Sequence, residues 1–154
     1  MANPILPLFA QSLGASGALI GFVTASFFLL RIFFEIPFGY VSDKIGRRIP
    51  IVIGLFVTVT GTILCGFAQD SFQLVSARML LGLSTGIFYS ATMALTIDIF
   101  DPPTREKTIG ILIGLETGGT FFGSIWSGFL ASMFNYRMVF FVGGLVLLPP
   151  FLFS

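Results

Sequence analysis

The sequence predicts an all-α membrane protein, a bundle of transmembrane helices. Three observations lead to this fold class. Hydrophobic residues make up 55% of the 154-residue chain and charged residues only 10%, the mean hydropathy is +0.99, and long apolar runs alternate with short polar connections. A soluble domain has about 25% charged residues. This chain therefore lacks the polar groups needed to cover a globule in water, and lipid is the solvent that its composition indicates.

Five runs are long enough to cross a bilayer, which takes about 20 mostly apolar residues. The first eleven residues resemble the outer end of a further helix whose beginning is missing, and the last run reaches Ser154 without a polar flank. We therefore expect a fragment of a longer membrane protein, or the product of a truncated gene. The predicted spans form one transmembrane domain, residues 1–154, and comprise 1–11 (partial), 17–41, 49–68, 72–99, 108–133 and 138–154.

Basic residues indicate how the spans are oriented. Five of the eight lie in the predicted loops 42–48 and 100–107, which share one side of the membrane because two spans separate them. The connections on the other side contain a single basic residue, Arg137. By the positive-inside rule, the two charged loops are cytoplasmic. We expect a multi-pass protein of the inner or plasma membrane.

Composition also excludes several classes of protein. The chain has no histidine and a single cysteine, Cys65, within an apolar run. A disulfide within the chain, a Cys/His metal site and a Cys–His catalytic pair are therefore excluded. No nucleophile–base pair is evident, so we expect neither an enzyme nor a cofactor. A net charge of +1 gives no indication of nucleic-acid binding.

Two halves of the sequence show a faint repeat. GALIGFVT (17–24) and GILIGLET (110–117) share Gly, Leu, Ile, Gly and Thr at an offset of 93, and Gly39 matches Gly128 at an offset of 89. The difference is about one helical turn. A three-helix unit would be inverted in its second copy, which is the inverted-topology repeat of secondary transporters. Chance similarity between apolar strings rich in Gly and Phe is the alternative.

A more specific pattern is Gly39-x-x-x-Asp43-Lys44-x-Gly46-Arg47-Arg48, between two spans and on the predicted cytoplasmic side. It resembles the signature of the major facilitator superfamily between its second and third helices. Three further stretches follow in the order of that family. LVSARMLLG (74–82) resembles its fourth-helix pattern, IDIFDPPTREKTIG (97–110) its next loop, and GILIGLETGGTFFGSIWSG (110–128) the fifth-helix motif of proton-coupled exporters.

The fifth-helix stretch departs from the motif at two positions. Ser124 stands where the motif has proline, and Ser127 where it has glycine. Its small-x-x-x-small patterns favour tight helix packing, and a pliable helix against a missing half is the functional alternative. The glycines of this motif are Gly110, Gly114, Gly119, Gly123 and Gly128.

The resemblance covers nearly all of the chain. It implies the N-terminal six-helix half of a twelve-helix major facilitator fold, with the first helix truncated. The chain resembles the drug:proton antiporter-like branch of the family. It also implies alternating access, in which two halves rock around a central site. The expected partners are the lipid bilayer, the missing C-terminal six-helix half, a small-molecule substrate and protons.

Gly39 and Asp43 are four residues apart and share a helix face. The glycine allows another helix to approach, and the Asp43 carboxylate would be stabilised by the positive N-terminal end of that helix. In the family this helix belongs to the other half, and the contact closes the cytoplasmic side. Asp98, at the end of the fourth helix, is the candidate partner of Arg47. Lys44 and Arg48 could be only positive-inside membrane anchors. The expected cytoplasmic gate motif comprises Gly39, Asp43, Lys44, Gly46, Arg47, Arg48 and Asp98.

Arg31, Arg78 and Glu116 lie in three different spans at similar depth, each roughly 12–18 Å from one end of its span at a rise of 1.5 Å per residue. Intramembrane charges are costly and usually face a cavity or pair together. We expect the three to line or support the central cavity, with Glu116 able to carry a proton. A permanent structural Arg–Glu pair is the alternative. Glu35, which could pair with Arg31 one turn away, ranks below them.

These features together predict secondary active transport of a small organic solute by alternating access, with proton-coupled export as the leading mechanism. Uptake or facilitated diffusion of a metabolite is the first alternative, because Ser124 departs from the exporter motif. A non-transporting membrane fragment or interaction protein is an alternative of another class, since six helices supply only half of a cavity wall.

Overall fold

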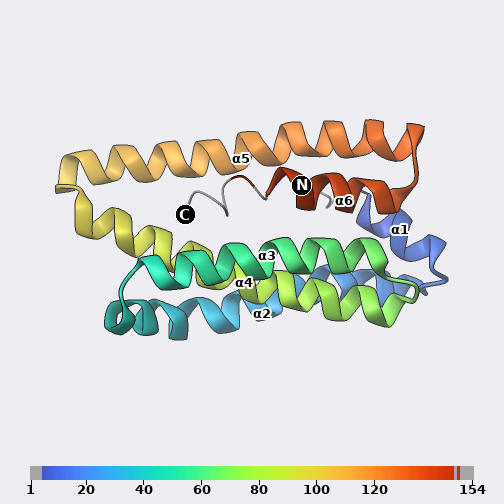
Figure 1. Ribbon diagram of the computed structural model, residues 1–154, viewed down its shortest axis with the longest axis horizontal. Coiled ribbons are helices and arrows are strands. Elements are labelled where there is room, and N and C mark those ends of the chain that lie inside the picture. The colour runs from blue at the N-terminus through green and yellow to red at the C-terminus, as the bar shows by residue number, and fades with distance from the viewer. Residues whose placement is uncertain (1–4, 148, 150–154) are drawn as a thin grey trace.

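The computed structural model describes residues 5–147 and 149, and the described part of the chain is helical throughout, without strands (Figure 1). The predicted all-α fold is confirmed. The helices are α1 (Leu6–Ser12), α2 (Gly17–Ile45), α3 (Arg48–Phe67), α4 (Ser71–Ile99), α5 (Pro102–Met133) and α6 (Tyr136–Val146). Four of them, α2 to α5, are long and apolar enough to cross a membrane.

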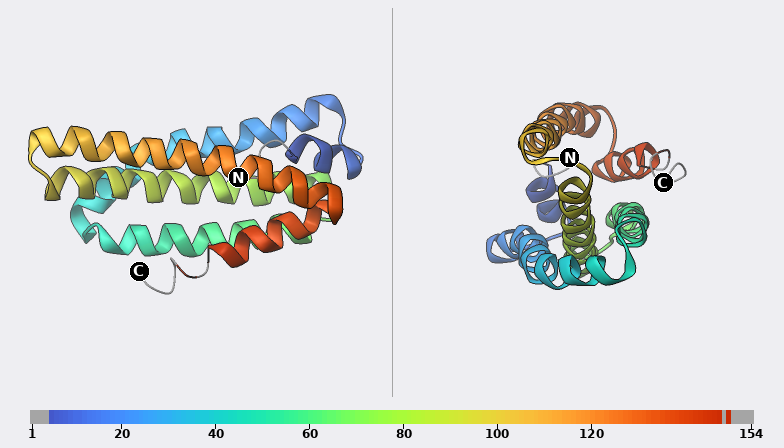
Figure 2. Two further views of the ribbon diagram at one scale, coloured as in Figure 1. Left: turned by 90° about the horizontal axis from the view of Figure 1, so that it is seen from above. Right: turned by 90° about the vertical axis from the view of Figure 1, so that its left-hand side faces the viewer.

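Helix α4 is the centre of the bundle. It packs against α2 on one side and α3 on the other, and α6 packs against α3. The end-on view in Figure 2 shows this arrangement, with α5 beyond the layer that α2, α3 and α4 form. Twelve residues of α4 are buried, whereas Ser127 is the only buried residue in α5. Helix α5 therefore presents most of its apolar surface outward.

Two glycines bring α2 and α4 into backbone contact. A Cβ atom on Gly82 would lie 2.2 Å from the carbonyl oxygen of Phe27, and one on Gly86 would lie 2.8 Å from that of Arg31. Any side chain at these positions would force the helices apart. Small residues are used in this way wherever membrane helices pack closely, so the pair fixes the register between α2 and α4.

The apolar core lies near the end of the bundle where α1 packs. Its most buried members include Leu6 and Phe9 of α1, Val23 of α2, Leu74 of α4 and Phe140 of α6. The rings of Phe9 and Phe140 are 5.5 Å apart. Short as it is, α1 therefore connects α2, α4 and α6 at this end.

The helices and the predicted spans differ at both charged connections. Helix α2 continues to Ile45 and ends at Gly46, whose φ of 89° suits a residue without a side chain. Helix α5 already begins at Pro102, where a missing N–H costs little. Most of the loops predicted at 42–48 and 100–107 is therefore helical. The end of the predicted span 138–154 lies outside the described residues, apart from position 149.

Candidate functional site

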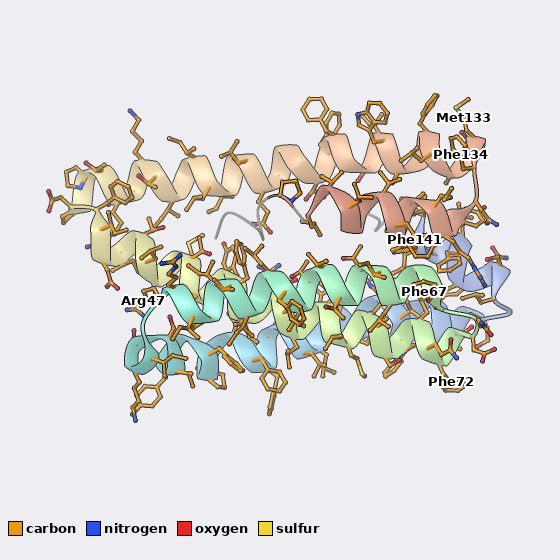
Figure 3. The ribbon with its side chains drawn as sticks, in the orientation of Figure 1. Arg47, Phe67, Phe72, Met133, Phe134 and Phe141 are labelled. Atoms are coloured by element: carbon orange, nitrogen blue, oxygen red, sulfur yellow. The ribbon has the colours of Figure 1, made fainter. Side chains whose placement is uncertain are left out.

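The charged cluster at the end of α2 is organised by Arg47. Its guanidinium pairs with the Asp43 carboxylate, and its Nε donates a 2.7 Å hydrogen bond to Oδ2 of Asp98 on α4. A third hydrogen bond, 3.3 Å from Nη1, goes to the buried hydroxyl of Ser42. One side chain thus joins the ends of α2, α3 and α4. Figure 3 labels Arg47 at this end of the bundle.

The electrostatics of the cluster favour a charged Arg47. The hydrogen bond to Asp98, and then the interaction with Asp43, raise the pKa of Arg47 above its ordinary value against the opposing effect of burial. The Arg47 side chain is only 19% exposed, whereas those of Asp43 and Asp98 are 57% and 50% exposed. Arg47 is therefore the half-buried hub, and each acid keeps one side open to a further partner.

The other members of the predicted cytoplasmic gate motif lie around this hub. A Cβ atom on Gly39 would meet nothing within 4 Å, so the helix face that it shares with Asp43 is open. The Nζ of Lys44 lies 4.6 Å from the centre of the Tyr40 ring, which holds the ammonium group by a cation–π contact. Gly46 ends α2, and Arg48 begins α3 on the exposed surface.

Arg31 is joined to α4 by an aromatic contact. Its Nε lies 3.6 Å from Oε2 of Glu35, one turn along α2. Its guanidinium lies 4.8 Å from the centre of the Tyr89 ring on α4. The structure thus pairs Arg31 with Glu35, the residue that the sequence ranked lower, rather than with Glu116.

Arg78 is almost completely buried, at 5% exposure, with its guanidinium 4.8 Å from the centre of the Phe27 ring. It lines a cavity of about 580 Å³ formed by residues of α2, α3, α4, α5 and α6. The wall is mostly apolar and includes Trp126, with hydroxyl groups from Thr58 and Thr85. Arg78 thus faces a cavity large enough for a small organic molecule.

Glu116 lies on the exposed surface of α5. Within residues 5–147, its carboxylate makes no ion pair or hydrogen bond. Neither Glu116 nor Arg31 is among the residues that line the Arg78 cavity. Equal depth therefore does not bring the three predicted charges together, because they occupy different faces of different helices.

The glycine face of α5 is open. Cβ atoms on Gly110, Gly114, Gly119 and Gly128 would each meet nothing within 4 Å, and Gly123 lines the cavity. The residues of α2 that match three of these glycines in the faint repeat are equally open: Gly17, Gly21 and Gly39. Both helices therefore offer surfaces that another helix can approach closely.

The family model for the Major Facilitator Superfamily matches residues 1–153. The chain belongs to the major facilitator superfamily. It is 36% identical over 122 residues to the inner membrane transport protein YajR of Escherichia coli K12, a match that covers 79% of this chain and 26% of YajR. It is 27% identical over 152 residues to the quinolone resistance protein NorA of Staphylococcus aureus, covering 98% of this chain and 39% of NorA.

This superfamily member thus spans about a quarter to two fifths of the length of these relatives. Its family and its four helices of membrane-spanning length make it an integral membrane protein. The family and its transport-related relatives agree with the predicted function class, membrane transport.

Three side chains of this superfamily member make structural contacts that the sequence analysis did not predict. Arg105 donates hydrogen bonds of 3.0 Å to the carbonyl of Ile97 and 3.3 Å to that of Phe100, and so caps the end of α4. Ser42 supports Arg47, and Tyr89 holds Arg31. A basic residue shortly after a helix end could have revealed the cap. Ser42 is only five residues from Arg47, but its hydroxyl reaches the guanidinium because the chain turns between α2 and α3. The role of Tyr89 depends on a contact between two distant helices, for which the sequence has no local signal.

Proposed function

We propose that this chain is the N-terminal half of a secondary transporter that moves a small organic solute by alternating access. In this proposal the cluster around Arg47 is one side of a cytoplasmic gate. The observation that carries it is the arrangement of Asp43: one face of its carboxylate is paired with Arg47, and the other is exposed beside the open Gly39. The positive N-terminal end of a helix from the missing half fits that open face.

Arg47 makes the gate responsive to movement. Because it contacts acids on both α2 and α4, a shift of either helix end changes how strongly Asp43 is neutralised. A few kcal/mol of differential interaction is enough to change which of two conformations predominates. Docking of the other half at Asp43 would then favour the state that is closed to the cytoplasm.

The gate is tested by transport in proteoliposomes that contain the complete transporter. Asp43→Asn removes the charge and preserves the shape, so transport should fall about tenfold or more while the amount of inserted protein stays the same. Asp101→Asn is the matched control, because Asp101 precedes α5 on the same side and its side chain makes no capping hydrogen bond. Unchanged transport by Asp43→Asn would overturn the gating role.

Proton-coupled export is the direction that we propose. It is supported by the glycine pattern of α5 and by similarity to a relative named for quinolone resistance. Glu116 is the proposed proton carrier on this helix, because its exposed carboxylate could face the other half. In everted vesicles, an imposed pH gradient should drive solute into the lumen, and Glu116→Gln should abolish that dependence. Movement of the solute without any response to the gradient would favour facilitated diffusion instead.

A further inference from the structure

An apolar groove lies between α3 and α4, at the end of the bundle opposite the Arg47 cluster. Its volume is about 380 Å³, which is within the range of small-molecule sites. Two buried alanines, Ala68 and Ala77, form its floor, and the exposed side chains of Leu64 and Phe67 form its walls. Figure 3 labels Phe67 and Arg47 at opposite ends of the molecule. The groove shares no lining residue with the larger cavity described above and is separate from it.

One end of the groove is polar. Gln73 and Ser76 line it there, whereas Leu80 lies about 10 Å further along α4 at 1.5 Å per residue. The Arg137 side chain reaches the same end from α6, where its Nη2 donates a 3.3 Å hydrogen bond to the carbonyl oxygen of Ala68. Because Ala68 lines the groove, the guanidinium of Arg137 lies at its polar rim. The groove thus combines a cationic end with an apolar remainder.

Arg137 has donors left for a ligand. A guanidinium has five N–H donors, and the bond to Ala68 is the only one that Arg137 donates among the described residues. Within the same residues it forms no ion pair, and Asp70, the acid of the turn between α3 and α4, is exposed. The rings of Phe67 and Phe141 are 5.0 Å apart, one turn beyond Arg137 on α6, and hold this helix beside the groove. The positive charge is therefore held at the groove without being neutralised by an acid.

Lipid is the neighbour that this groove meets. Helices α3 and α4 are both long and apolar enough to cross a membrane, and the walls of the groove are exposed. The surfaces open to the other half lie on α2 and α5, at Gly39 and the α5 glycines, so docking of that half does not require the groove. A bilayer supplies elongated apolar chains that end in a phosphate group, and the charge of Arg137 complements that group.

We propose that the groove binds one phospholipid, with an acyl chain between α3 and α4 and its phosphate at Arg137. An arginine fork matches two phosphate oxygens at once, which an ammonium group does not. The Gln73 side chain keeps its NH₂ group as a further donor, since its Oε1 already accepts a 2.9 Å hydrogen bond from the backbone N–H of Gln69. Basic groups beside pockets between membrane helices recognise lipid head groups in this way. The inference goes beyond the proposed transport function and does not depend on it.

The test titrates the purified, delipidated complete transporter with dioleoylphosphatidylglycerol and counts the bound lipids by native mass spectrometry. One lipid should bind more tightly than those that follow. Dioleoylglycerol, which has the same chains without the phosphate, should bind this first site about tenfold or more weakly. Inorganic phosphate should not displace the lipid, because it makes no contact with the apolar part of the groove. Displacement by phosphate, or equal binding of the two lipids, would reject a phospholipid site.

Two variants remove the two parts of the site separately. Arg137→Gln removes the charge and should weaken binding of the first lipid about tenfold or more, whereas Arg137→Lys should retain part of the affinity. Lys107→Gln is the control for charge, because Lys107 is exposed near the start of α5. Ser76→Leu fills the groove and should also weaken binding of the first lipid. Its matched control is Ser132→Leu, since Ser132 is exposed near the end of α5 and, like Ser76, donates to the carbonyl three residues earlier.

The outcomes of these measurements decide the lipid site independently of transport. Wild-type affinity in either Arg137→Gln or Ser76→Leu, or an equal loss in the two controls, would overturn the site while leaving the Asp43 transport assay unaffected. If Arg137→Gln does not fold because its bond to Ala68 is lost, Ser76→Leu and the comparison of the two lipids on wild type still decide.

Discussion

The Nε of Arg47 lies 2.7 Å from the Asp98 carboxylate, although 51 residues separate the two along the chain. This contact joins the start of α3 to the end of α4, and the same guanidinium also pairs with Asp43 on α2. Neighbouring ends of three helices are thereby connected through a single side chain.

Because Asp98 is half-exposed, we expect its pair with Arg47 to contribute little to stability. Exposed ion pairs are screened by solvent and contribute little. A double-mutant cycle with Arg47→Gln and Asp98→Asn, measured by unfolding in SDS, should give only a small coupling free energy. The cycle of Arg47→Gln with Asp101→Asn is the control and should show none. A coupling as large as that of buried ion pairs would indicate a structural pair instead.

The geometry of Arg47 predicts that lysine cannot replace it. A guanidinium has five donors in a planar fork and can contact Asp43, Asp98 and Ser42 together, whereas an ammonium is a compact point charge. Arg47→Lys should therefore lower transport several-fold while the charge is preserved. Lys107→Arg is the control, since Lys107 is exposed near the start of α5. Wild-type transport by Arg47→Lys would mean that charge alone is sufficient at this position.

The contact between α2 and α4 predicts unequal effects of two Gly→Ala substitutions. At Gly82 the added methyl group would lie 2.2 Å from the Phe27 carbonyl oxygen, so α2 and α4 must separate. Overpacking of this kind costs about 1–3 kcal/mol. At Gly114 it would meet nothing within 4 Å, and alanine is the better helix former. Thermal unfolding should therefore show loss of stability for Gly82→Ala alone. Equal stability of the two variants would contradict the close packing.

The sequence predicted how deep each residue lies in the membrane better than it predicted which side of its helix the residue occupies. Apolar length was enough to place the long helices, and the charge pattern was enough to pair Arg47 with Asp98. Hydropathy could not locate the helix ends, because both long helices include polar residues beyond their apolar segments. Helix α2 ends only at Ile45, and α5 already begins at Pro102. Helical hydrogen bonding continues beyond the apolar segment.

The same limit explains the intramembrane charges. Depth follows from residue count, so Arg31, Arg78 and Glu116 could be placed at one level. Their directions around each helix depend on which helices pack together, and this is decided by Gly82 and Gly86 on α4. These contacts place Arg31 beside Tyr89, and leave Glu35 as its only charged partner among the described residues.

The open glycine face of α5 predicts a difference between the isolated chain and the complete transporter. Gly114→Leu adds a side chain where the 154-residue chain has no neighbour within 4 Å of the Cβ position, so this chain should insert and unfold as wild type does. In the complete transporter the same leucine would stand where the other half docks, and transport should fall about tenfold or more, since small residues there permit close helix approach. Ile111→Leu is the matched control, because position 111 already has a large exposed side chain. Full transport by Gly114→Leu would place the docking surface elsewhere, whereas instability of the isolated chain would mean that α5 packs within its own half.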